Sequence, residues 1–258
     1  MFHICLLSCA ITATAAKMTP FIVGGNEASI KDWPFIVFMQ MTRGHRTASC
    51  GGSLLSSQTV LTAAHCVDDF TKKKRKKVTF NIFMGHSSFS KATMMRTGLD
   101  YQSHKDYSPT DSTVQNDIAI LFLSKPVKFG PKIRKTVLQP RFSDAADNKV
   151  AVAGWGKTDI YGRRISKKLK AVFLKSSLSK KCKKWDGLIC IKFSDEYPYT
   201  GDSGGPMVNA KTLQQIGIVS FRDMSTGVIA FTSVPYYWDW IERNQLKLFI
   251  KFCVGKRS

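Results

Sequence analysis

The sequence predicts an all-β fold, a barrel or a sandwich, that ends in a single helix. Short apolar runs rich in Val, Ile and Phe recur along the chain, and Gly, Pro, Ser, Asp or Lys residues separate them. This is the pattern of strands joined by turns. The last segment instead spaces its apolar residues as a helix does. The expected strands are 35–41, 78–84, 118–123, 150–153, 171–174, 216–221 and 229–234.

The expected helix begins at about Pro235, because proline suits a first helical turn. An amphipathic helix usually packs on the body of its own domain. We therefore expect it to lie on the barrel, with binding of its basic face to a membrane as the alternative. The apolar residues at helical spacing are Tyr236, Trp240, Ile241, Leu248 and Phe252.

The composition is that of a folded and strongly basic chain. Of the 258 residues, 43% are hydrophobic and 11% aromatic, and the formal net charge is +21. Such a charge attracts anionic partners, and we expect polyanion binding through Lys72–Lys77, with solvated loops as the alternative. Nucleic acid is not an expected partner, because the basic runs belong to no recognised binding module.

The N-terminus has the features of a signal peptide over residues 1–16. An uncharged apolar run reaches from Ile4 to Ala16, and the small residues at its end suit cleavage. The run is too short to span a bilayer, and no later stretch looks transmembrane. We expect a secreted, extracellular protein; the alternative is that this run is an apolar first strand.

Five cysteines remain after Cys5 and Cys9 leave with the signal peptide. An oxidising compartment favours disulfides, but the sequence alone does not determine which cysteines pair. No group of residues has metal-ligand spacing, so neither a metal nor a cofactor is expected. The remaining cysteines are Cys50, Cys66, Cys182, Cys190 and Cys253.

Three short motifs carry candidate catalytic residues. Taken singly, each has a structural explanation, as a structural histidine, a turn aspartate or a tight glycine turn. The motifs are Leu61–Cys66 around His65, Asn116–Leu121 around Asp117 and Gly201–Pro206 around Ser203.

In this order and with these flanking residues, the motifs resemble those of the chymotrypsin-like (trypsin-fold) serine proteases. The resemblance extends from Ile22 to about Asn244. Further matching segments are Cys50–Leu54, Gly154–Gly156 and Ile218–Phe221.

The resemblance implies two six-stranded antiparallel β-barrels with a C-terminal helix, formed by a protease domain over residues 22–258. It also implies a serine endopeptidase that forms an acyl-enzyme, with protein or peptide substrates and protein inhibitors as partners. Ser203 is the expected nucleophile, and His65 is its general base and acid. Asp117 would orient the imidazole, and the N–H groups of Gly201 and Ser203 would form the oxyanion hole.

The segment Ile22–Gly25 resembles the start of a mature protease of this family. The resemblance implies that residues 17–21 are a short propeptide and that an activating protease cuts before Ile22. The freed α-amine would pair with Asp202, because a buried carboxylate without a partner is costly. Phe21 precedes the cut, so the activator is chymotrypsin-like or the protein cleaves itself.

The same resemblance implies which cysteines pair. Cys50 would join Cys66, and Cys182 would join Cys190. Each bridge would contribute about 2–4 kcal/mol. Cys253 is then left as a free thiol or as half of an intermolecular bridge.

Departures from the family pattern concentrate around the substrate pocket. Tyr197 stands where trypsin-like enzymes carry an aspartate, so specificity for Lys or Arg is not expected; its ring either fills the pocket or turns away. Tyr199 replaces a cysteine of the family. The expected pocket residues are Tyr197, Thr200, Ser220, Phe221 and Arg222.

Arg222 replaces a glycine that keeps the pocket mouth open. It caps the pocket, attracts an acidic substrate side chain, or points to solvent. Ser220 is expected beside the Asp117 carboxylate. With this altered pocket and the high positive charge, the alternative function is a catalytically impaired homologue that acts as a cationic binding protein.

Overall fold

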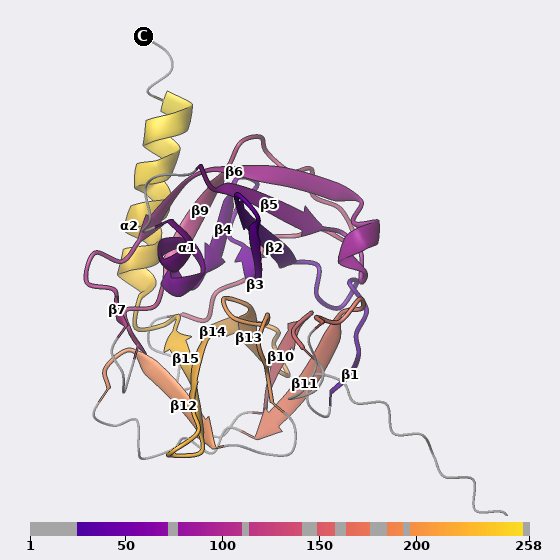
Figure 1. Ribbon diagram of the computed structural model, residues 1–258, viewed down its shortest axis with the longest axis vertical. Coiled ribbons are helices and arrows are strands. Elements are labelled where there is room, and N and C mark those ends of the chain that lie inside the picture. Colours follow the sequence, from indigo (N-terminus) through magenta and orange to yellow (C-terminus); the bar gives the residue numbers. More distant parts are fainter. Residues whose placement is uncertain are drawn as a thin grey trace, which may run out of the picture.

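Two β-structures lie one above the other in the computed structural model, and a C-terminal helix runs along the side of the upper one (Figure 1). The structure describes residues 25–71, 77–109, 114–140, 149–157, 164–175, 185–192 and 197–254. The expected signal peptide and propeptide lie outside these ranges, and so do Ile22, Lys72–Lys76 and Cys182.

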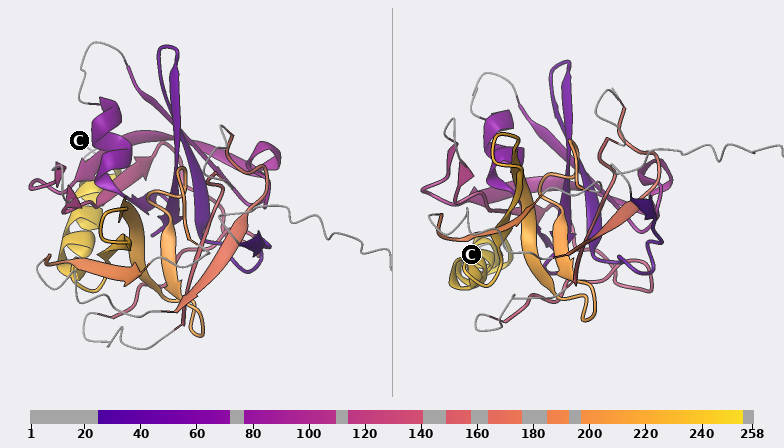
Figure 2. Two further views of the ribbon diagram at one scale, coloured as in Figure 1. Left: turned by 60° about the horizontal axis from the view of Figure 1, so that its bottom comes forward. Right: turned by 90° about the horizontal axis from the view of Figure 1, so that it is seen from below.

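The upper structure is a closed barrel of six antiparallel strands in the order β2-β3-β4-β9-β6-β5. The β2–β3 hairpin extends beyond the rest of the barrel (Figure 2). The strands are β2 (Ile36–Arg43), β3 (Arg46–Leu54), β4 (Thr59–Thr62), β5 (Thr79–Met84), β6 (Met94–Ser103) and β9 (Ala119–Leu123).

The lower structure is a seven-stranded antiparallel sheet in the order β1-β11-β10-β13-β14-β15-β12. The seventh strand is the two-residue β1, which pairs with β11. The strands are β1 (Asn26–Glu27), β10 (Lys149–Gly154), β11 (Lys170–Lys175), β12 (Leu188–Lys192), β13 (Pro206–Asn209), β14 (Gln215–Asp223) and β15 (Val228–Ser233). The predicted all-β fold with a C-terminal helix is therefore confirmed, with β1 as an added edge strand.

The helices differ in detail from the prediction. Helix α1 (Ala64–Thr71) was not expected, and a 3-10 turn, η1 (Phe89–Lys91), precedes β6. The C-terminal helix α2 (Trp238–Phe249) begins three residues after Pro235 and continues into η3 (Ile250–Val254). A short hairpin joins β7 (Ser108–Pro109) to β8 (Val114–Gln115).

Helix α2 begins late because the residues before it are held in a turn. Val234 is fully buried, and the Tyr237 hydroxyl donates a hydrogen bond to Asn116 Oδ1 at 2.8 Å. The first helical bond joins the Ile241 N–H to the Tyr237 carbonyl. The helix then packs on the barrel, where Phe252 stacks on Phe122 with ring centroids 4.8 Å apart. No helix in the described part of the chain is long and apolar enough to cross a membrane.

Aromatic side chains fill the junction between the two structures. Phe38 of β2 stacks on Phe89 with a centroid distance of 4.3 Å and meets the edge of Trp155 at 5.9 Å. Phe38 and Trp155 are each 2% exposed, and they share one apolar cluster with Val208 of β13. Burial of apolar area at this junction holds the two structures together.

We expect Phe38→Ala to lower the free energy of unfolding by about 3–5 kcal/mol, because it removes a ring from this packed junction. Phe173→Ala is the matched control, since the Phe173 side chain is 63% exposed; its effect should stay within about 0.5 kcal/mol. Urea unfolding of the two variants measures the difference. Equal effects would show that the junction does not depend on Phe38.

Candidate active site

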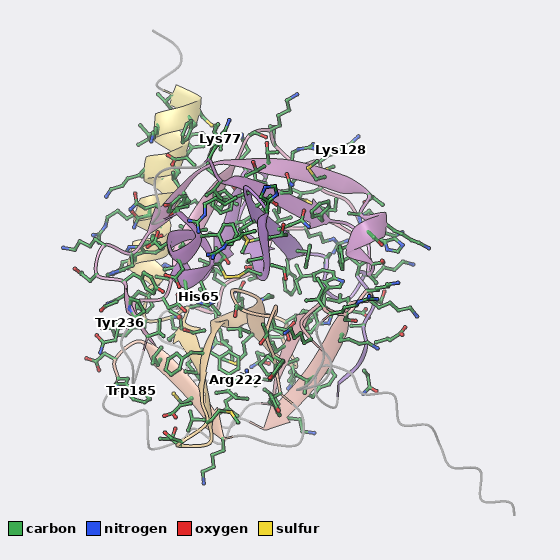
Figure 3. All side chains as sticks on the ribbon, viewed as in Figure 1. His65, Lys77, Lys128, Trp185, Arg222 and Tyr236 are labelled. Carbon is green, nitrogen blue, oxygen red and sulfur yellow. A yellow bond between two sulfur atoms is a disulfide. The ribbon has the colours of Figure 1, made fainter. Side chains whose placement is uncertain are left out.

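The candidate residues gather where the barrel faces the sheet. Figure 3 shows His65 at this boundary and Arg222 within the lower structure. His65 is the second residue of α1, Asp117 precedes β9, and Ser203 lies in the turn before β13. Three separate parts of the fold therefore supply these side chains of one site.

Asp117 is fully buried and accepts three hydrogen bonds. The His65 N–H donates to Oδ1 at 2.9 Å, His65 Nδ1 bonds Oδ2 at 2.8 Å, and Ser220 Oγ donates to Oδ2 at 2.5 Å. The Thr232 hydroxyl also bonds the Asp117 carbonyl. These donors come from both β-structures, so the carboxylate is held rigidly against the imidazole.

A strained residue directs Asp117 into this position. Asn116 has φ +52°, a left-handed conformation that non-glycine residues seldom adopt. Its side chain is held at both ends, because Nδ2 donates to the Asp106 carbonyl and Oδ1 accepts from Tyr237. Such strain persists only where the surroundings enforce it, and here it turns the next side chain inward.

The electrostatics of the pair favour an ionised Asp117 and a protonated His65. Burial alone would raise the pKa of Asp117, but the charge of His65 and the hydrogen bonds from His65 and Ser220 hold this pKa below its usual value. Burial would lower the pKa of His65, but the charge and hydrogen bond of Asp117 raise it above 6.5. A protonated His65 is therefore stabilised by the carboxylate behind it.

The Ser203 turn is fixed to the barrel by backbone contacts. The Gly51 N–H of β3 donates to the Ser203 carbonyl at 2.7 Å. Gly204 has φ +78°, and a Cβ there would lie 2.2 Å from Thr62 Oγ1. Gly201 has φ +104°. A side chain at Gly204 would therefore both strain the turn and push it away from the barrel.

The backbone N–H groups of Gly201 and Ser203 donate no hydrogen bond within the described part of the chain. Both groups are thus available to a ligand. Among the described residues, Ser203 Oγ does not hydrogen-bond His65 Nε2, which instead lies 3.6 Å from the disulfide sulfur of Cys66. Hydrogen bonds of this kind are often long in ligand-free sites and shorten on substrate binding.

Asp202 is a second fully buried carboxylate. Its Oδ1 accepts from the Gly156 N–H at 2.7 Å, and Oδ2 accepts from the Tyr199 N–H at 2.9 Å. A Cβ at Gly154 or Gly156 would lie within 2.3 Å of its oxygens, so only glycines leave room for it. No cation of the described residues forms an ion pair with it, and burial raises its pKa to about 6.

A disulfide joins Cys50 to Cys66 and ties β3 to the start of α1 beside the imidazole. Among the described residues, Cys50, His65 and Cys66 place potential metal-ligand atoms within 4.8 Å of one another, but both sulfurs belong to this bridge. Cys190 is also disulfide-bonded, whereas its expected partner Cys182 lies outside the described residues. Cys253 is a free thiol, half-buried, with Sγ 3.8 Å from Gln58 Oε1.

A cavity of about 230 Å³ opens beside Ser203. Of the five expected pocket residues, Thr200, Ser220, Phe221 and Arg222 line it. Tyr197 is not among the described residues that line it; its half-buried ring packs against the apolar cluster of the lower sheet. Of the two alternatives drawn from the sequence, this position corresponds to the ring that turns away from the pocket.

Residues that the sequence did not place in the pocket also line it, and Tyr199 is the most informative. Its ring lies under the Arg222 guanidinium, whose central carbon is 3.9 Å from the ring centroid. The sequence signal that could have identified Tyr199 was its position four residues before Ser203, because the Ser203 turn brings this part of the chain to the cavity wall. The other additional lining residues are Pro198, Val219 and Met224.

Comparisons with known proteins agree with this geometry. The Trypsin family model matches residues 22–241. Trypsin epsilon of Drosophila erecta is 29% identical over 259 residues, which cover 93% of this chain and 95% of that protein.

Two solved structures share the fold. HL collagenase aligns with a TM-score of 0.73 and 25% identity, over 86% of this chain and 97% of that one. A scabies mite inactivated protease paralogue, S-D1, aligns with a TM-score of 0.72 and 25% identity, over 85% and 95% of the two chains. The match over most of the chain, together with the barrel, the sheet and the helix, shows that this protein belongs to the trypsin family of chymotrypsin-like serine endopeptidases.

Proposed function

We propose that this family member cleaves peptide bonds with Ser203 as nucleophile, His65 as general base and acid, and Asp117 as the group that orients His65. The observation that carries the proposal is the buried Asp117 carboxylate. It is bonded to the backbone N–H and to ring atom Nδ1 of His65, beside the turn that presents Ser203. A serine hydroxyl is a poor nucleophile at neutral pH and needs such a base.

In the reaction, Ser203 Oγ attacks the carbonyl carbon of the substrate while His65 Nε2 accepts the hydroxyl proton. The carbonyl electrons move to oxygen, where the N–H groups of Gly201 and Ser203 stabilise the charge. His65 returns the proton to the leaving amine as the C–N bond breaks. Water, deprotonated by His65, then hydrolyses the acyl-enzyme and regenerates Ser203.

We further propose that the chain is secreted after removal of residues 1–16 and activated by cleavage before Ile22. The buried Asp202 supports this proposal, since a carboxylate so enclosed gains most from a new cationic partner. The released Ile22 amine would supply that partner. The proposed partners are protein or peptide substrates, an activating protease and protein inhibitors, and the run 72–77 remains our proposed polyanion contact.

The cavity supports a specificity unlike that of trypsin. Among its described lining residues there is no carboxylate that would pair with a substrate Lys or Arg. The ring of Tyr197 occupies the neighbouring apolar cluster instead.

The second candidate is a catalytically impaired homologue that acts as a cationic binding protein. Two observations favour it: Ser203 Oγ is not hydrogen-bonded to His65, and a protein described as an inactivated protease shares the fold. Labelling of the nucleophile separates the two candidates.

A fluorophosphonate probe should label protein processed to begin at Ile22, and Ser203→Ala should abolish the labelling, because the probe reacts only with an activated serine. Gel fluorescence and the mass of the adduct measure the reaction. Ser57→Ala is the control, since Ser57 is a half-buried serine that belongs neither to the site motifs nor to the described lining of the cavity. Absence of labelling in correctly processed, folded protein would favour the binding-protein candidate.

Asp117→Asn should lower the pKa of the His65 imidazole below 6.5, because burial then acts without the opposing charge. The wild-type acid limb of kcat/KM should lie above pH 6.5, and activity should fall as the pH decreases through it. The variant should lose about 10⁴-fold in kcat. NMR titration of the ring protons measures the pKa, with Asp106→Asn, an exposed carboxylate near His104, as control. An unchanged His65 titration in Asp117→Asn would contradict the assignment.

The uncut chain should lose stability as the pH rises toward and through about 6, because the folded pKa of Asp202 lies above 3.8, the usual value of an aspartate. Its stabilising contribution is complete below pH 3.8 and is lost once the buried group must ionise, a total of about 3 kcal/mol. Urea unfolding at pH 5 and 8 measures the part lost above pH 5, which is about 1.4 kcal/mol.

The loss attributed to Asp202 should be much smaller in Asp202→Asn, and also in protein cut before Ile22, where the new amine pairs with the carboxylate. The comparison with Asp202→Asn separates this effect from the titration of His65. Identical pH dependence in cut and uncut protein would contradict the proposed activation.

A further inference from the structure

Arg222 differs from the other cations of the described chain in lying against the cavity beside Ser203. It belongs to β14, two residues after Ser220, which bonds Asp117. The cavity of about 230 Å³ is smaller than a typical drug-sized site of about 300–1,000 Å³. It therefore suits one substrate side chain.

Two aromatic rings hold the guanidinium in place. Its central carbon lies 3.9 Å from the Tyr199 ring centroid and 5.8 Å from that of Tyr197. The two rings are themselves in contact, with centroids 6.1 Å apart. The structure therefore does not contain one of the alternatives drawn from the sequence, an Arg222 side chain that extends freely into solvent.

Stacking on a ring uses the face of the guanidinium and leaves its in-plane N–H groups available. Within the described chain, Arg222 donates no hydrogen bond and forms no ion pair. A planar cation with free donors is the group best suited to bind a carboxylate through two parallel hydrogen bonds.

Two described carboxylates near Arg222 are already occupied: Asp223, its neighbour in sequence, and Asp202, on which its charge acts. Asp223 accepts hydrogen bonds from the hydroxyls of Ser225 and Thr226 at 2.6 Å each, and these bonds lower its pKa to about 2. Asp202 is held by the backbone of Gly156 and Tyr199. No acidic side chain is among the residues that line the cavity in the described part of the chain.

We propose that this cavity binds an acidic side chain of the substrate, Glu or Asp, and that Arg222 selects it by a bidentate charge-assisted contact. The bound side chain belongs to a residue beside the scissile bond, because the cavity adjoins Ser203, and the proposal places it on the acyl side. The proposal rests on the proposed function. Tyr199 acts as a positioning residue that keeps the cation at the cavity wall.

The contact should discriminate strongly between a carboxylate and its uncharged isostere. A hydrogen bond to a charged group contributes about 1.5–3 kcal/mol, which corresponds to about 10- to 100-fold in kcat/KM. Because the site is partly exposed, salt should weaken the preference. A substrate Lys or Arg would meet the Arg222 charge and should be cleaved poorly.

The test compares peptides that differ only in the residue before the scissile bond: Glu, Gln, Asp, Asn, Ala, Leu and Lys. The readout is the ratio of kcat/KM for Glu over Gln in processed wild type, Arg222→Gln, Arg222→Lys and Tyr199→Leu. This ratio cancels a general loss of activity, such as one caused by a change at Asp202, whose pKa the Arg222 charge lowers. Arg243→Gln, an exposed residue of α2, is the matched control.

We expect a Glu/Gln ratio of about 10–100 in wild type and Arg243→Gln. The ratio should fall to near 1 in Arg222→Gln and be partly retained in Arg222→Lys. In Tyr199→Leu it should decrease without disappearing, because the cation remains but is less well placed. A wild-type ratio near 1, or a ratio that Arg222→Gln leaves unchanged, would overturn the proposal.

Binding to Ser203→Ala separates this proposal from the proposed catalysis. Fluorescence polarisation with the same Glu and Gln peptides reports recognition without turnover. If wild type resists the fluorophosphonate probe but Ser203→Ala prefers the Glu peptide through Arg222, the catalytic proposal fails and the recognition proposal holds. If the probe labels Ser203 and no Glu preference appears in either assay, the catalytic proposal holds and the recognition proposal fails.

Discussion

The carboxylate of Asp117 is the point on which the arrangement of the site depends. It is fully buried, and removal of a carboxylate from water is costly unless hydrogen bonds and an opposite charge replace the lost hydration. His65 of α1 and Ser220 of β14 supply those bonds, so the barrel and the sheet must approach in one relative position. The same requirement explains the strained Asn116 and the turn before α2, since Tyr237 fixes that asparagine.

Asp202 presents the same physical problem with a different solution. Two backbone N–H groups bond its oxygens, and Gly154 and Gly156 leave the space that it fills, but no described cation forms an ion pair with it. Its raised pKa records the remaining cost of burial. Asp117 therefore has an ion-pair partner in the chain as it stands, while Asp202 has none among the described residues. This difference supports our proposal that cleavage before Ile22 supplies Asp202 with a cationic partner.

The cavity beside Ser203 combines a tightly held turn with a wall of different chemistry. The backbone around Ser203 is held by contacts that leave little freedom, such as the Gly51–Ser203 bond and the enclosed Gly204. The described cavity wall carries Tyr199 and Arg222 and no acidic group. Stacking satisfies the guanidinium face without consuming its donors, so the cation is both positioned and available.

The sequence by itself determined the family, the all-β class, seven of the strands and the motifs around His65, Asp117 and Ser203, because the local spacing of apolar residues and short motifs need no long-range information. It missed α1 and several strands, among them β3, β4, β6, β12 and β13. The half-exposed residues of α1 and β6 give a weaker apolar pattern. It placed the start of α2 at Pro235, whereas a tertiary bond from Tyr237 to Asn116 delays it. Only the tertiary structure decided that Tyr197 turns into the apolar cluster and Tyr199 supports Arg222, since the direction of a side chain depends on the cavity and neighbours that distant segments create.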